Sequence, residues 1–215
     1  MKMDPGIVRF SLGVRGTGLA GRTVDFNDVF SGAAWSQLQP PMNHPDFRAA
    51  VSDEMTLLLT PQQFDVKVSN GSDDDLEKAF AVLKAVSEYA GKGQLSQFHN
   101  SWHCHLLAGD DAVAALRNRL RDALPGLFKP TNDLPVQVST SSSLSGNRAE
   151  EVELYLAPES SAGGHAKMVV VDLSHAFKFQ PSKLKNPTQA AARESKSVSQ
   201  RLEVIRQAIS EGTTT

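Results

Sequence analysis

The chain has 215 residues, of which 40% are hydrophobic and 21% are charged. This composition is typical of a globular protein that can bury a sizeable core, and it is too apolar for a disordered chain. The formal net charge of −2 excludes a global field that would attract nucleic acid or an acidic membrane, so a nucleic-acid surface would have to be a local basic patch.

The sequence contains one cysteine, Cys104. An intramolecular disulfide and a four-cysteine zinc site are therefore excluded. The first ten residues, MKMDPGIVRF, do not resemble a secretory signal, and no stretch approaches the ~20 apolar residues of a membrane span. We therefore expect a cytoplasmic protein without membrane contact.

The N-terminal part of the chain predicts one strand followed by an irregular region. Residues 7–14 alternate between apolar and polar side chains, which is typical of a half-buried strand. Residues 15–54 are rich in glycine and proline and are interpreted as irregular and loop-rich. They include a G-x-G-x-x-G match at Gly16–Gly21, but no helix is predicted to begin there, so we interpret it as a turn and expect no dinucleotide cofactor.

The middle of the chain alternates strands with two helices. Pro61 separates two strands within residues 56–70, and a helix follows between Ser72, its predicted N-cap, and Gly91. A histidine-rich strand comes next, and residues 110–124 form a second amphipathic helix. Three further strands are expected at residues 135–140, 151–157 and 167–173, and the serine- and glycine-rich segments between them are interpreted as loops.

The last predicted element is a helix at residues 188–210. Its apolar stripe is as narrow as a coiled-coil seam and consists of Ala191, Ser195, Val198, Leu202, Ile205 and Ile209. The seam packs either on the protein's own sheet, which we favour, or on a partner helix. We predict one α+β domain over residues 1–180, with helices on one face of a mainly antiparallel sheet, then a connection at 181–187 and the C-terminal helix.

The stretch HNSWHCHLLAG, residues 99–109, contains three of the six histidines. On a strand, a period of two places Trp102, Cys104 and Leu106 on one face, together with Phe98 and Asn100. His103 and His105 lie on the other face with His99. We therefore expect Cys104 to be buried and inert, because its histidine neighbours point away from it.

His103 and His105 are the candidate metal ligands. Side chains two apart on a strand leave the backbone ~7 Å apart, so both imidazoles could bind one zinc or iron ion. A catalytic site needs a third ligand, for which Asp172, His175 and His165 have suitable side chains. The alternative, which we favour, is a solvent-facing strand surface without a metal.

Arg117 and Arg121 lie one turn apart on the second predicted helix. They are candidate phosphate or nucleic-acid contacts through a local basic patch. Asp122, next to Arg121, reduces the net positive charge of this patch. The alternative, which we favour, is a solvated helix face without a ligand.

The sequence contains no G-x-x-x-x-G-K-[ST], H-E-x-x-H or G-x-S-x-G motif. We therefore expect a non-enzymatic binding protein without a cofactor, which contacts a protein partner, associates with itself or forms part of an assembly. The alternative is a metal-dependent enzyme centred on His103 and His105, with zinc or iron as its cofactor.

Overall fold

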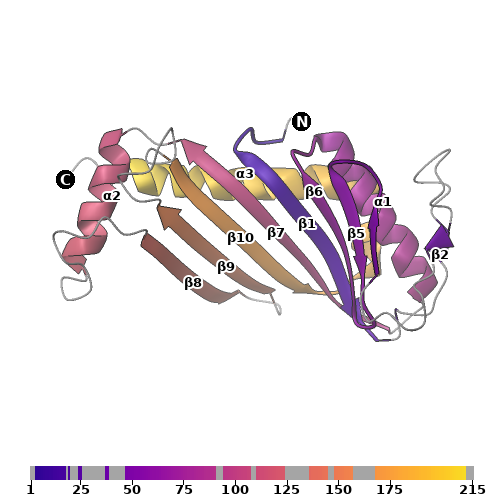
Figure 1. Cartoon of the computed structure of the whole chain (residues 1–215). Helices are drawn as coiled ribbons and strands as arrows, with labels where there is room; N and C mark the ends of the chain where they lie inside the picture. The colour runs from indigo at the N-terminus through magenta and orange to yellow at the C-terminus, as the bar shows by residue number, and fades with distance from the viewer. Residues whose placement is uncertain are drawn as a thin grey trace.

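A computed structural model describes residues 3–17, 19, 24–25, 37–38, 47–90, 94–107, 110–123, 136–144, 148–156 and 168–211. Eight strands form one sheet in the order β4-β5-β6-β1-β7-β10-β9-β8, and every neighbouring pair is antiparallel. Helices cover one of its faces (Figure 1). The predicted α+β class, with helices on one face of an antiparallel sheet, is therefore confirmed.

The bounds of the elements are as follows. The strands are β1 (Ile7–Gly16), β2 (Val24–Asp25), β3 (Gln37–Leu38), β4 (Phe47–Ala50), β5 (Met55–Leu59), β6 (Gln63–Ser69), β7 (Leu95–Leu107), β8 (Val136–Leu144), β9 (Arg148–Leu156) and β10 (Met168–Lys178). The helices are α1 (Asp73–Ala90), α2 (Asp110–Ala123) and α3 (Pro187–Glu211), with a 3-10 turn, η2 (Pro181–Leu184), before α3. Strands β2 and β3 form a separate two-stranded sheet.

Strands β8, β9 and β10 are longer than the sequence predicts. β8 continues to Leu144 and β9 begins at Arg148, so most of the serine-rich segment that we interpreted as a loop belongs to the sheet. β10 continues to Lys178, opposite Gln97 of β7. The backbone hydrogen bonds to a neighbouring strand outweigh the weak intrinsic strand preference of serine. Which strands are neighbours cannot be read from a single sequence.

The connection predicted at 181–187 is also partly ordered. It contains the 3-10 turn η2, which buries Leu184 to 2% exposure. Pro181 starts this turn, where its missing N–H costs no hydrogen bond.

The core lies between the sheet and helices α1 and α3. The yellow helix α3 runs across the far side of β10, β7 and β1 as seen in Figure 1, and its predicted seam is buried, with Val198 and Leu202 at 0% exposure. The seam therefore packs within this chain, as favoured above. No helix in the described part of the chain is long and apolar enough to cross a membrane.

The opposite face of the sheet carries the alternate side chains of the same strands, and we call it the open face. Across β1, β7, β10 and β9 one of its rows consists of Arg9, His103, Asp172 and Glu153. The next row consists of Ser11, Ser101, Ser174 and Glu151. A hollow of about 410 Å³ lies near the second row, with Ser101 and Ser174 in its lining.

Leu202→Asp tests the seam of α3. Placing a carboxylate at a fully buried position should lower the melting temperature strongly, because an unpaired buried charge is costly. The neighbouring change Val204→Asp is the matched control, since Val204 is 52% exposed, and it should leave the melt nearly unchanged. Equal melting temperatures for the two variants, measured by circular dichroism, would contradict the packing described here.

Candidate functional site

Strand β7 sorts its side chains onto two faces, as its alternation predicts. Trp102, Cys104 and Leu106 are buried, with exposures of 1%, 0% and 2%, whereas His103 and His105 lie half-buried on the open face. Burial, followed by the charges of Asp4 and Asp172, raises the pKa of Cys104 to about 12. The thiol therefore stays protonated at neutral pH and is a poor nucleophile.

His103 and His105 face each other across a short gap. Their Nε2 atoms are 3.2 Å apart, and their rings are inclined at 68°. On the other side of its ring, His103 Nδ1 lies 2.6 Å from Asp172 Oδ1, because the β7–β10 register places Asp172 directly opposite His103. The carboxylate fixes the orientation of the His103 ring and leaves its Nε2 directed at His105.

The two Nε2 atoms point at each other as in a hydrogen bond, and their separation also matches that of two ligands of one tetrahedral metal ion. Zinc–nitrogen bonds of ~2.0–2.1 Å place two ligand nitrogens about 3.3–3.4 Å apart, close to the observed Nε2 separation. A carboxylate on the second ring nitrogen is also the usual outer partner of a metal-bound histidine, and Asp172 occupies that place. Among the described residues, however, no group of three or more histidine, cysteine, aspartate or glutamate side chains could hold a metal.

Among the described residues, the other predicted ligands do not complete the site. Asp172 contacts His103 from the far side of its ring. His175 is on the core face, at 3% exposure, and His165 lies outside the described residues. His99 is on the open face, but it pairs with Asp65 instead.

The His99–Asp65 pair bridges two strands that do not touch each other. His99 Nε2 lies 2.7 Å from Asp65 Oδ1, and Gln63 Nε2 donates to the second carboxylate oxygen at 2.6 Å. Both His99 and Asp65 stand opposite Gly13 of the intervening strand β1. A Cβ atom at position 13 would collide with the carboxylate and the imidazole, so the pair forms only because that residue is glycine.

A second polar cluster lies on the core face, beneath α3. The register places Asn100, His175 and Glu150 side by side on β7, β10 and β9. His175 Nδ1 lies 3.1 Å from Asn100 Oδ1 and its Nε2 lies 2.9 Å from Glu150 Oε2. From α3, Arg201 donates to Glu150 at 2.7 Å, and Glu194 accepts from Asn100 at 2.5 Å.

Glu150 is ionised within this buried cluster. Burial acts to raise its pKa, but the hydrogen bond with His175 and the positive charge of Arg201 together outweigh it, so the pKa lies below its usual value. One feature of the sequence indicates the cluster, because Asn100 interrupts an otherwise apolar face of β7. Glu150 carried no such signal, since it falls in the segment interpreted as a loop.

The predicted basic pair on α2 is only partly described. Arg117 is 5% exposed, so it does not belong to the solvated helix face that we favoured. The side chain of Arg121 lies outside the description. A phosphate contact by this pair stays a prediction.

No protein-family model matches the chain, and no curated protein matches it. Inferences about function therefore rest on the geometry of these side chains.

Gly13→Ala tests the bridge between His99 and Asp65. The added methyl group would separate the two side chains or displace β1, and we expect a loss of roughly 1–3 kcal/mol in the free energy of unfolding. Ser11→Ala, on the same face of β1, is the control and should stay within about 0.5 kcal/mol of the wild type. Urea denaturation gives both values, and equal stabilities would show that the glycine is not required.

Proposed function

We propose that this protein acts by binding another protein, or a second copy of itself, through the open face of its sheet. The observation that carries the proposal is a group of apolar side chains at one end of that face. We call it the apolar patch, and it consists of Leu107, Tyr155, Met168 and Val170. Leu107 is 83% exposed and Tyr155 is 37% exposed.

The strand register makes the patch continuous. Leu107 stands opposite Met168, and Val170 stands between His105 and Tyr155. Met168 and Val170 are half-buried between the exposed Leu107 and Tyr155. Contiguous apolar side chains that remain accessible to solvent mark interaction surfaces, and tyrosine and methionine are enriched in the cores of protein interfaces. The histidine pair borders the patch and would supply polar contacts at its rim.

The charges of the open face favour a protein over a nucleic acid as the partner. Arg9 lies in one row with Asp172 and Glu153, and the next row ends in Glu151, so these rows carry acidic groups as well as a basic one and form no basic stripe. The proposed function needs no cofactor. The expected location remains the cytoplasm, where the unpaired thiol of Cys104 would stay reduced.

Site-specific photo-crosslinking tests the apolar patch. A benzophenone amino acid replaces Leu107 in the full chain, and irradiation of producing cells should give a discrete adduct with the partner or with a second copy. Adding Tyr155→Lys should reduce this adduct, because a charge at the centre of an interface is costly to desolvate.

The matched control carries the same amino acid at Val204, which is exposed on α3. This position should give no adduct of the same mass. Adducts of equal yield at both positions, or an adduct at 107 that Tyr155→Lys leaves unchanged, would contradict binding through the patch.

The histidine pair supports a second candidate function, metal binding. Its specific support is the 3.2 Å separation of the two Nε2 atoms, with Asp172 behind His103. A zinc or iron enzyme centred on His103 and His105 would need a further protein ligand, so a partner could complete the coordination.

Isothermal titration of the untagged protein with zinc tests this candidate. We expect one ion per chain, loss of binding in His105→Ala, and binding weakened about 10–100-fold in Asp172→Asn through loss of the outer contact. His99→Ala is the control, because that histidine pairs with Asp65. Zinc binding that survives His105→Ala would place the metal elsewhere.

A further inference from the structure

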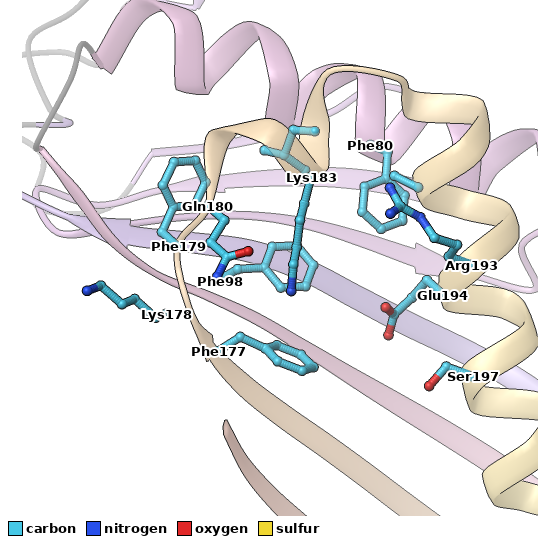
Figure 2. Close-up of a pocket in the computed structure, with 12 residues that line it drawn as sticks. Phe80, Phe98, Phe177, Lys178, Phe179, Gln180, Lys183, Arg193, Glu194 and Ser197 are labelled. Atoms are coloured by element: carbon cyan, nitrogen blue, oxygen red, sulfur yellow. The ribbon is translucent and has the colours of Figure 1, made fainter. Parts of the chain in front are cut away.

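A cavity of about 230 Å³ opens on the helix side of the sheet, away from the open face. It lies where the ends of β7 and β10 meet α1, η2 and α3. Figure 2 shows its aromatic side chains coming from separate elements. The cavity is therefore formed by segments that are distant in the sequence. For that reason no local sequence motif predicts it.

Four phenylalanine side chains line this cavity. Phe80 of α1 stacks on Phe98 of β7 with ring centroids 6.1 Å apart, and Phe98 lies 6.0 Å from Phe177 of β10. Phe179 completes this lining. Four phenyl rings favour a flat apolar ligand, and an apolar cavity of ~150 Å³ already accepts benzene. The space here suits one or two fused rings.

The remaining groups around the cavity favour a negative charge on the ligand. Lys183 lies 5.7 Å from the Phe177 ring centroid, and Figure 2 shows its side chain extending across the cavity. Arg193 of α3 lines the same space. The nearby carboxylate, Glu194, accepts a hydrogen bond from buried Asn100, so part of its acceptor capacity is already used within the protein.

From this combination we propose that the cavity is a binding site for a small aromatic anion, a molecule of one or two rings that carries a carboxylate or sulfonate. The rings lie among the phenylalanine side chains, and the anionic group faces Lys183 and Arg193. This site is independent of the proposed open-face contact, because it is built on the opposite side of the sheet.

A matched pair of ligands tests both halves of the proposal. At pH 7.5, 2-naphthoate is an anion, and 2-naphthamide is a neutral molecule of nearly the same shape. We expect saturable 1:1 binding of both in calorimetric titrations, with the anion bound about fivefold more tightly, as contacts with exposed cations would give. The double change Lys183→Gln plus Arg193→Gln should abolish the tighter binding of 2-naphthoate. The affinity for 2-naphthamide should stay unchanged.

Two further variants locate the site. Ser197→Trp places a large side chain on the lining of the cavity. It should lower the affinity for both ligands more than tenfold. Lys185→Gln changes an exposed lysine that is not part of the lining and should change nothing. The glutamine variants alter exposed side chains, so they keep the test valid even if Ser197→Trp does not fold.

Each unfavourable outcome overturns a defined part of the proposal. Absence of saturable binding by the wild type would overturn the site. Undiminished binding by a folded Ser197→Trp variant would place the ligand elsewhere. Equal wild-type affinity for naphthoate and naphthamide would overturn the anionic preference.

Discussion

The register between β7 and β10 is the constraint on which the histidine pair, the buried polar cluster and the apolar patch all depend. The two strands pair without interruption from Leu107 opposite Met168 to Gln97 opposite Lys178. This one alignment sets His103 against Asp172 on the open face and Asn100 against His175 beneath α3. A slip by a single residue would exchange the two faces of a strand and dismantle both clusters.

The buried cluster of Asn100, His175 and Glu150 helps to enforce that register. A polar side chain is tolerated in a core only when its hydrogen bonds are made, and here the partners are supplied across strands and by α3. A slip by two residues, which keeps each side chain on its own face, would leave these groups buried without partners, whereas an apolar core would tolerate such a slip more easily. The cluster thus specifies both the alignment of the strands and the position of α3.

Local pattern was sufficient to predict much of this architecture. The alternation of side chains predicted Trp102 and Cys104 in the core and His103 and His105 on the other face of the sheet. The spacing of apolar residues predicted the buried seam of α3. The contacts of His103 with Asp172 and of His99 with Asp65 depend on which strands are neighbours, and a single sequence does not state this. The strand assignment of Ser141–Leu144 was missed for the same reason, and so was the aromatic cavity, whose phenylalanines come from distant segments.

The position of α3 in the chain has a consequence for how the protein is made. The helix follows every strand that the structure describes, yet it covers the apolar side of a sheet whose first strand begins at Ile7. At ~5–20 residues per second, synthesis of its 25 residues takes about 1–5 s. During that interval the strands beneath α3 lack the helix that covers their apolar side. These strands are therefore most prone to aggregate in the interval before α3 is made.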